Sequence, residues 1–212
     1  MLDSVLVLKQ VIPKERIHKH ISEYNRSNTR HPGIMNTADP GVYMNAYDDL
    51  ISSHLRKKVT AISGNYYKHS IPYLPHTDWK SHLANVYNAV IPLHYTQDQP
   101  RFIIFDQIWK YESVTWAMGF DVKMLGNKVG VNTAVIGCPN DYDVKNLINK
   151  PIDDRLYEEN LSHYTKEMCY GLSGTVTHFE PGDIILFNNQ NIHCTSTFSG
   201  EKLGLSLRFK YG

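Results

Sequence analysis

Cysteine is scarce in this chain, and neither sign of charge dominates. Its 212 residues include three cysteines, Cys138, Cys169 and Cys194. An odd, widely spaced set without a Cys-x-x-Cys pair argues against both a disulfide framework and a structural zinc site. The formal net charge is +1, so no global electrostatic field would attract the protein to nucleic acid or to an anionic membrane. Function therefore has to be sought in a few side chains.

Long apolar runs are also missing. Residues 1–9 contain only a short apolar stretch, with an early Asp3 and no basic segment before it, so we expect neither a signal peptide nor a membrane span. We predict a strand here, in a cytoplasmic protein. With 42% hydrophobic and 20% charged residues, the chain has an ordinary globular composition and enough length to bury the core of a single domain.

Helical patterns occur in the N-terminal third and again near residue 153. Residues 13–24 begin with a proline suited to a first helical turn and place Ile17, Ile21 and Tyr24 on one face. Residues 48–58 have acids in the first turn and bases in the last, as the helix dipole favours. Residues 153–164 return to helical spacing. We expect all three helices to pack outside a sheet.

Strand patterns dominate from about residue 59. Residues 59–73, 85–93 and 101–105 read as strands, and residues 179–187 read as a strand, a Pro-Gly turn and a second strand, that is, a hairpin. Strand pairs of this kind build a jelly roll. Residues 107–140 interrupt the pattern with a long mixed segment, which is typical of a lid or a binding loop.

The first chemical candidate is a His-x-Asp triplet, His76 and Asp78. Residues i and i+2 of a strand share a face, so both side chains would project into one cavity. His193, far downstream, would complete two imidazoles and one carboxylate, the facial set that holds non-haem Fe(II) and leaves positions open. A residue of each of these types, taken alone, is more often an ordinary surface residue than a metal ligand, so the prediction depends on the joint order of the three.

Two nearby features compete with this assignment. His178-Phe179-Glu180 is also a His-x-acid triplet, but it lies so close to His193 that all ligands would come from one small region. We therefore reject it as the metal motif. Cys194 adjoins His193 but would point to the opposite face of a strand, so we predict a small buried hydrophobic residue there.

Residues 203–210 alternate with a period of two. This pattern places Ser206 and Arg208 on one face and Leu205, Leu207 and Phe209 on the other. An arginine that faces the inside of a barrel needs an anion, and the planar guanidinium group suits a carboxylate.

In order and spacing these motifs resemble the Fe(II)/2-oxoglutarate-dependent dioxygenases. The resemblance covers residues 59–106 and 172–212, and it implies a mainly β fold, the double-stranded β-helix or cupin-like jelly roll, within one domain spanning residues 1–212. Residues 1–58 would supply a strand and supporting helices, and residues 107–171 an insertion or lid and a helix.

The resemblance also implies cofactors and their ligands. Fe(II) would be held by His76, Asp78 and His193, the distal carboxylate of 2-oxoglutarate would pair with Arg208, and O2 would be the oxidant. A further contact to the cosubstrate is predicted for the Asn-x-Tyr that precedes the metal histidine by about one strand. Ser206 either donates a hydrogen bond to the carboxylate that Arg208 holds or is a strand serine that faces water. Tyr87 either contacts the cosubstrate or fills the barrel, and three tryptophans either wall a substrate pocket or simply pack. These additional candidates are Asn65, Tyr67, Tyr87, Trp79, Trp109 and Trp116.

The activity implied is oxidative decarboxylation of 2-oxoglutarate by O2, coupled to hydroxylation of a small-molecule or peptidyl substrate. Halogenating relatives carry a small residue in place of the acid, so Asp78 argues against that chemistry. One alternative is a non-catalytic cupin-like module that binds a ligand or metal. Another is a nucleic-acid demodifying enzyme, for which the basic cluster is too thin: Lys14, Arg16, Lys19, Arg26 and Arg30. We expect neither a nucleic-acid nor a membrane partner.

Overall fold

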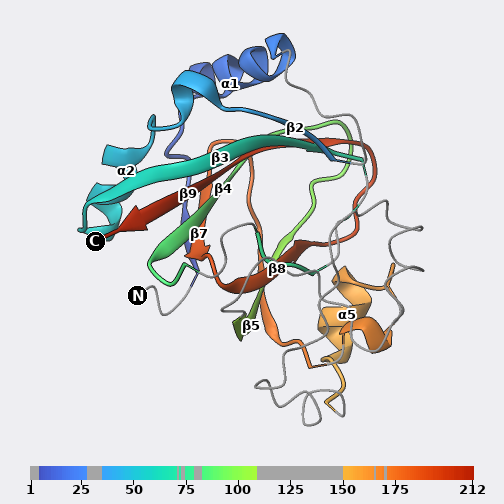
Figure 1. The fold of residues 1–212 in the computed structure, drawn as a ribbon. Helices are drawn as coiled ribbons and strands as arrows, with labels where there is room; N and C mark the ends of the chain where they lie inside the picture. The colour runs from blue at the N-terminus through green and yellow to red at the C-terminus, as the bar shows by residue number, and fades with distance from the viewer. Residues whose placement is uncertain are drawn as a thin grey trace.

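The computed structural model describes residues 5–27, 35–70, 72, 75–78, 83–108, 150–164, 166–169 and 171–212. Two antiparallel sheets form its framework (Figure 1). The larger sheet has the order β1 (Leu6–Leu8), β7 (Ile184–Asn188), β4 (Val86–Tyr95), β9 (Lys202–Tyr211), β3 (Val59–His69) and β2 (Met35–Ala38). The smaller sheet has the order β6 (Gly174–Thr177), β5 (Phe102–Ile108) and β8 (Asn191–Thr195). The predicted mainly β jelly roll is confirmed.

The last four strands alternate between the two sheets, because β6 and β8 belong to the smaller sheet and β7 and β9 to the larger. The predicted hairpin over residues 179–187 is therefore wrong. Strand β6 pairs with β5, whereas β7 pairs with β1 and β4. The Pro181-Gly182 turn instead carries the chain from one sheet to the other, and Gly182 has a φ of +107° that side-chain-bearing residues avoid.

A buried carboxylate fixes this crossing. Asp183 has no exposed surface, and it accepts hydrogen bonds from Lys9 Nζ at 2.8 Å, from the Gln10 backbone N–H at 2.9 Å and from the Glu180 backbone N–H at 3.1 Å. The residues after β1 are thereby joined to the turn before β7. The Pro-Gly-Asp sequence is thus a corner between layers, not the loop of a hairpin.

Asp183→Ala is expected to lower the free energy of unfolding by about 2 to 4 kcal/mol, because it leaves two backbone N–H groups without their charged acceptor. Urea denaturation followed by circular dichroism would measure the loss. The control is Glu158→Ala, at an exposed position on a surface helix, which should change stability by less than about 0.5 kcal/mol. Equal stabilities of the two variants would contradict the conclusion that Asp183 fixes the crossing between the two sheets.

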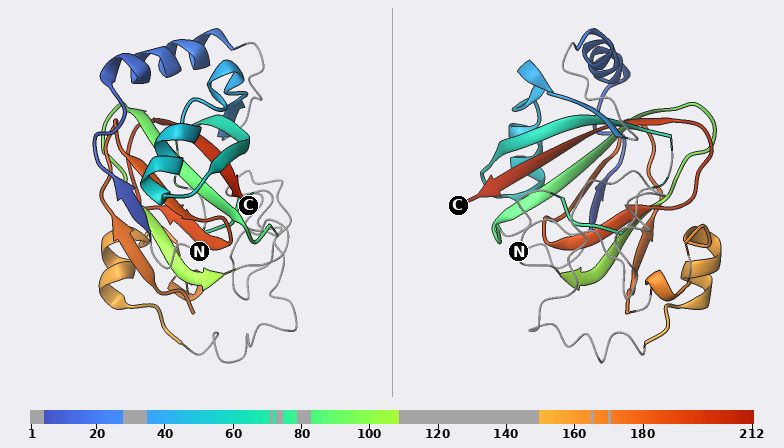
Figure 2. Two further views of the ribbon diagram at one scale, coloured as in Figure 1. Left: turned by 90° about the vertical axis from the view of Figure 1, so that its left-hand side faces the viewer. Right: turned by 45° about the vertical axis from the view of Figure 1, so that its right-hand side comes forward.

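The helices lie outside the sheets. Figure 2 shows α1 (Lys14–Arg26) and α2 (Asp48–Leu55) over the outer face of the larger sheet, with α5 (Asp154–Asn160) beside the smaller one. Helices α1 and α2 bury Ile17, Tyr24 and Ile51 in the same cluster as Leu205 and Phe209 of β9. Two short 3-10 turns, η1 (Gly41–Tyr43) and η2 (Lys166–Cys169), complete the described elements.

A polar contact is buried between the larger sheet and the helical segments that cover its outer face. His20 of α1 has no exposed surface, and its ring nitrogens contact the hydroxyl groups of Tyr66 on β3, at 2.8 Å, and of Tyr47 just before α2. A neutral imidazole has one donor and one acceptor nitrogen, and each hydroxyl can play either part. One side chain therefore links two helical segments and the sheet.

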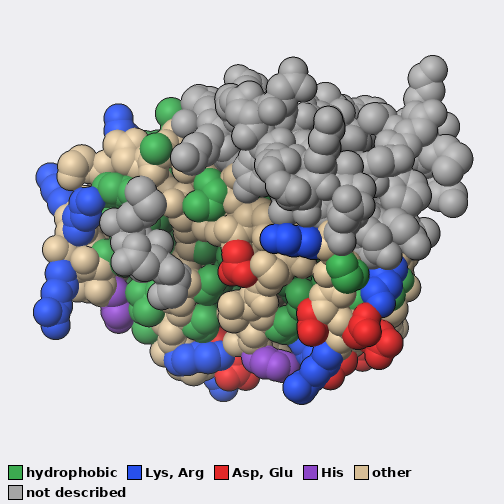
Figure 3. All heavy atoms as spheres, turned by 90° about the horizontal axis from the view of Figure 1, so that it is seen from below, with side chains coloured by type: hydrophobic (Ala, Val, Ile, Leu, Met, Phe, Trp, Pro, Cys, Tyr) green, Lys and Arg blue, Asp and Glu red, His purple; other side chains and the backbone are tan. Residues whose placement is uncertain are grey.

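The surface shows charges of both signs. Figure 3 shows the molecule from below, and the described part of this face carries both basic and acidic side chains. No helix in the described ranges combines the length and the apolar character needed to cross a membrane. The segment predicted as a lid, residues 107–140, lies outside the described residues except for positions 107 and 108.

Candidate metal centre

The two candidate histidines are neighbours through their backbones. His193 lies on β8, and His76 lies in the segment after β3, where the two residues form an isolated antiparallel bridge. The His76 N–H donates to the His193 carbonyl at 2.9 Å, and the His193 N–H donates to the His76 carbonyl at 2.8 Å. Main-chain hydrogen bonds thus join two residues that are more than a hundred positions apart.

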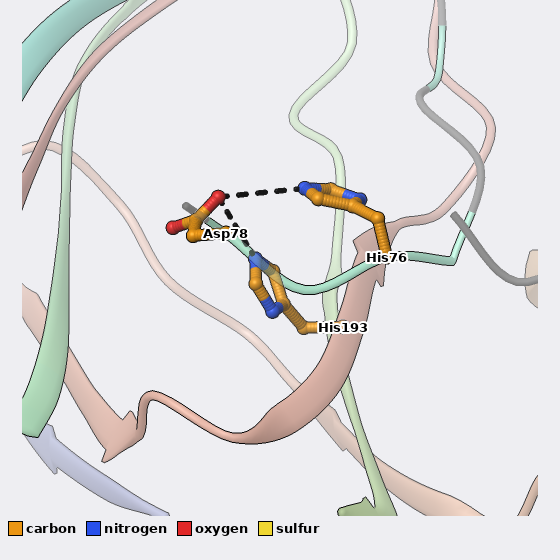
Figure 4. Close-up of side chains that lie close together, drawn as sticks. All are labelled: His76, Asp78 and His193. Carbon is orange, nitrogen blue, oxygen red and sulfur yellow. Dashed lines mark ion pairs between the residues drawn. The ribbon is translucent and has the colours of Figure 1, made fainter. Parts of the chain in front are cut away.

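Asp78 completes the cluster, as Figure 4 shows. Its Oδ1 lies 3.7 Å from His76 Nε2 and 3.8 Å from His193 Nε2. One candidate ligand atom from each of the three residues lies within 4.8 Å of the other two. Among the described residues this is the group of histidine, cysteine and acidic side chains that could hold a metal ion.

The protonation states of this cluster suit a cation. Burial lowers the pKa of His193, so its ring is neutral at neutral pH. Its Nδ1 lies 3.1 Å from the Asn191 carbonyl, and a neutral ring that donates there presents its Nε2 lone pair to the cluster. Burial acts to raise the pKa of Asp78, but Arg208 and the two imidazoles outweigh it and hold that pKa well below its usual range.

Aromatic rings cover one side of the cluster. The ring of Phe102 stacks on His193 with 5.6 Å between centroids, and Phe187 lies 4.8 Å away at a tilt. Both phenylalanines are buried. A wall of this kind excludes water from the imidazole and fixes its orientation.

The second oxygen of Asp78 has partners of its own. Its Oδ2 accepts from Arg208 Nη2 at 2.9 Å and from Asn88 Nδ2 at 3.0 Å. Arg208 also donates from Nη1 to Asn65 Oδ1 at 3.0 Å. The predicted residues Asn65 and Arg208 are therefore brought to the cluster, and Arg208 makes an ion pair with Asp78 itself.

The remaining predicted residues of β3 and β9 share this interior. Tyr67 lies on the same strand face as Asn65, and Ser206 on the same face as Arg208. The Tyr67 hydroxyl closely approaches Gly204, where an added Cβ would lie 2.3 Å from its oxygen. Ser206 Oγ and Arg208 Nε are buried and have no hydrogen-bond partner among the described residues.

Tyr87 is not brought to the interior. It is adjacent on β4 to Asn88, which contacts Asp78, so its side chain is directed to the opposite face. There it stacks on Tyr211 with 4.5 Å between ring centroids. The prediction that it contacts a cosubstrate is corrected by this alternation. Nor does it fill the barrel, since it packs on the outer face of the sheet.

The remaining sequence predictions concern the second His-x-acid triplet, Cys194 and the three tryptophans. The rejected triplet has both His178 and Glu180 exposed, and Cys194 is buried in the cluster that β5 and β8 form with α5, as predicted from its strand position. The three tryptophans, Trp79, Trp109 and Trp116, lie outside the described residues.

Sequence reasoning missed Lys202, the first residue of β9. Its side chain is buried, with Nζ 3.1 Å from Thr195 Oγ1 and over the rings of Tyr67 and Phe198. Burial lowers its pKa to about 7. The alternation that places Ser206 and Arg208 inside extends back to this residue, but the run considered above begins at Leu203. Asn88 was missed as well, because nothing in the sequence around it distinguishes it from other asparagines on strands.

Comparison with known proteins shows the fold. No protein-family model and no curated protein matches the chain. HygX from Streptomyces hygroscopicus, solved with nickel and 2-oxoglutarate bound, is 16% identical with a TM-score of 0.52, over 98% of this chain and 82% of HygX. The alpha-ketoglutarate-dependent epimerase SnoN from nogalamycin biosynthesis is 9% identical with a TM-score of 0.54, over 99% and 77% of the two chains.

A third structure, an oxidoreductase of the 2OG-Fe(II) oxygenase family from Burkholderia pseudomallei, is 7% identical with a TM-score of 0.54, over 97% of this chain and 84% of the other. The chain therefore has the double-stranded β-helix fold of the 2-oxoglutarate- and iron-dependent oxygenases. At these identities the likeness concerns the fold.

Proposed function

We propose that the protein is an Fe(II)- and 2-oxoglutarate-dependent dioxygenase, with His76, Asp78 and His193 as the metal ligands. One observation carries the proposal, namely the meeting of two imidazole nitrogens and a carboxylate oxygen within 4.8 Å inside a jelly roll. This donor set suits Fe(II) and leaves coordination positions for a second ligand.

The interior beside the triad suits a dicarboxylate. Ser206 Oγ and Arg208 Nε are buried donors without partners among the described residues, and Lys202 is a buried amine whose described hydrogen bond is to a hydroxyl group. Buried donors and cations of this kind need acceptors. The carboxylate oxygens of 2-oxoglutarate would provide them.

The cofactors and the chain have separate tasks. Bound Fe(II) and 2-oxoglutarate would supply, together with O2, the oxidising power for a C–H bond, and succinate and CO2 would be released. The phenylalanine wall keeps water from His193, and the Asn191 carbonyl fixes the ring so that Nε2 faces the metal position. Tyr67 lines the interior between the two sheets.

We propose hydroxylation of a small molecule as the outcome. Support comes from HygX, which was solved with hygromycin B bound, and from SnoN, which was solved with nogalamycin RO. SnoN is an epimerase, so products should be analysed for inversion at carbon as well as for added oxygen. A peptidyl substrate and a cytoplasmic location remain predictions.

The test is succinate formation from 2-oxoglutarate by the purified protein with Fe(II) and ascorbate in air, followed by NMR. We expect slow turnover without substrate that stops when iron is chelated. His76→Gln should abolish it, because the variant removes a metal ligand whose side chain is only 19% exposed. His178→Gln is the matched control, since it changes an exposed histidine of the rejected triplet, and it should retain full turnover.

Two results would count against the proposal. Tight iron binding without any succinate would favour the non-catalytic cupin-like module. Loss of turnover in His178→Gln with retention in His76→Gln would place the metal at the other triplet.

A further inference from the structure

Asn88 is a polar residue with no exposed surface in the larger sheet. It lies on β4 between Phe187 of β7 and Arg208 of β9, so the three side chains form a row across three strands. Phe187 packs against the ring of His193. Arg208 pairs with Asp78. The row therefore supports two members of the triad from the larger sheet.

The two ends of the Asn88 amide have different surroundings. Nδ2 donates a hydrogen bond to Oδ2 of Asp78 at 3.0 Å. Oδ1 is buried and has no hydrogen-bond partner among the described residues. Turning the amide over would place its carbonyl oxygen against a carboxylate oxygen, and two acceptors repel each other. Asp78 therefore holds the amide in an orientation that leaves the amide oxygen unpaired.

An unpaired buried acceptor is unfavourable for folding, and an apolar side chain of similar shape would avoid that cost. Asn160 on α5 shows the usual arrangement of a buried asparagine. It is 2% exposed, its Nδ2 donates to the Leu156 carbonyl at 3.1 Å, and its Oδ1 accepts from Arg101 Nη1 at 3.2 Å. Folding stability therefore accounts for an asparagine at position 160 but not for one at position 88.

The contact of Asn88 bears on which oxygen of Asp78 is offered to a metal. A carboxylate can rotate, or it can bind a metal through both oxygens. A donor on Oδ2 leaves Oδ1 facing the imidazoles, 3.7 Å from His76 Nε2 and 3.8 Å from His193 Nε2. Hydrogen bonds from outside the ligand set orient ligating carboxylates in this way and tune metal affinity.

Arg208 donates to the same oxygen at 2.9 Å, but the two donors differ. The guanidinium group is charged and ends a long chain, so any anion that enters the interior competes for it. The amide of Asn88 is neutral and short, and its strand is hydrogen-bonded to a neighbour on either side. Asn88 is therefore the donor that stays on Oδ2 when the interior is occupied.

We propose that Asn88 is a positioning residue of the metal centre, whose amide holds Oδ2 of Asp78 and so presents Oδ1 alone to the cation. The inference rests on the proposed function for the presence of a metal at the triad. It predicts that loss of this side chain lowers metal affinity without lowering folding stability.

The experiment separates metal affinity from stability. Calorimetry measures the binding of Mn(II), a redox-stable probe, to the metal-free protein, and circular dichroism measures the midpoint of its urea unfolding. Asn88→Leu removes the amide but keeps a branched side chain. It should weaken Mn(II) binding by about 10- to 100-fold, and the urea midpoint should stay unchanged or rise, because the unpaired acceptor is gone.

Asn160→Leu is the matched control, a second buried asparagine whose amide is bonded at both ends. It should lower the urea midpoint, because it removes two hydrogen bonds that stabilise the fold. Its affinity for Mn(II) should stay within about threefold of that of the unaltered protein. The two variants should thus show opposite patterns.

Co(II) provides a readout of the coordination itself. The visible absorption bands of Co(II) lose intensity as the coordination number rises, and binding of Asp78 through both oxygens would raise that number. Asn88→Leu loaded with Co(II) should therefore absorb less strongly than the unaltered protein, whereas Asn160→Leu should give the same bands as the unaltered protein.

Three results would overturn the positioning role. They are unchanged Mn(II) affinity in Asn88→Leu, Co(II) bands identical to those of the unaltered protein, and a fall in urea midpoint like that of Asn160→Leu. If Asn88→Leu fails to fold, Asn88→Ala takes its place with Asn160→Ala as its control. Failure of both Asn88 variants to fold would mark a structural residue and overturn the inference as well.

Each of these results would leave the proposed function standing, because the unaltered protein would still bind the metal. Absence of Mn(II) binding by the unaltered protein would instead overturn the proposed function, and this inference with it.

Discussion

Asp78→Ala is expected to abolish metal binding and also to lower the free energy of unfolding of the metal-free protein by about 3 to 5 kcal/mol. The first effect follows from loss of the one carboxylate in the triad. The second follows from Arg208, whose side chain is 9% exposed and would lose its ion-pair partner. Removing one member of a buried pair costs more than the pair contributes, because the other charge stays buried.

Chemical denaturation in the presence of a chelator would measure this loss, and calorimetry with Mn(II) the loss of binding. The double variant Asp78→Ala/Arg208→Met is the control. It should regain more than about 1 kcal/mol relative to Asp78→Ala, because the uncompensated charge is gone, yet it should still bind no metal. Unchanged stability of Asp78→Ala would mean that the guanidinium group finds water or another partner.

The second large effect concerns acid stability. Burial, assisted by Arg16, lowers the pKa of His20 to about 4 from an ordinary value near 6.5. Between these two values the unfolded chain binds a proton that the folded protein does not. The contribution of His20 is therefore fully present above pH 6.5, declines as the pH falls, and levels off below pH 4, with a total change of roughly 3 kcal/mol.

Denaturant unfolding at a series of pH values between 7 and 4 would reveal this contribution. His20→Gln keeps a side chain able to bond to Tyr47 and Tyr66 but removes the titration, so its stability should depend less steeply on pH than that of the unaltered protein. His18→Gln, at an exposed position on the same helix, should retain the original slope. Identical slopes for all three proteins would refute the assignment.

The sequence predicted the elements with strong local signals. Helices α1 and α2 follow from apolar spacing and from charges at their ends, and β9 follows from the strict alternation over residues 203–210. The pair His76 and Asp78 is predicted by a His-x-Asp spacing, which places both side chains on one face of an extended backbone, and His193 is predicted by the order of motifs that the family resemblance implies. The helix patterns, the strand alternation and the His-x-Asp spacing can each be recognised within a short stretch of sequence. Folding then brings these stretches together.

What the sequence could not supply is pairing between distant strands. The turn at Pro181-Gly182 looks the same whether the chain returns within a sheet or crosses to the other one, and the Asp183 contacts with Lys9 and Gln10 that accompany the crossing are long-range. The same applies to Arg208, which was assigned an external anion. Its ion-pair partner among the described residues, Asp78, lies 130 positions earlier in the chain, and no local pattern reveals this contact.

The paired hydrogen bonds between His76 and His193 determine which changes the site can tolerate. Main-chain hydrogen bonds hold His76 and His193 side by side. The side chains around the two imidazoles can therefore change without displacing them. A one-residue insertion in either segment would rotate an imidazole to the opposite side. Substitutions of side chains around the centre should thus leave the two imidazoles in place, whereas a change in the length of the chain from Pro75 to Asp78 should displace them.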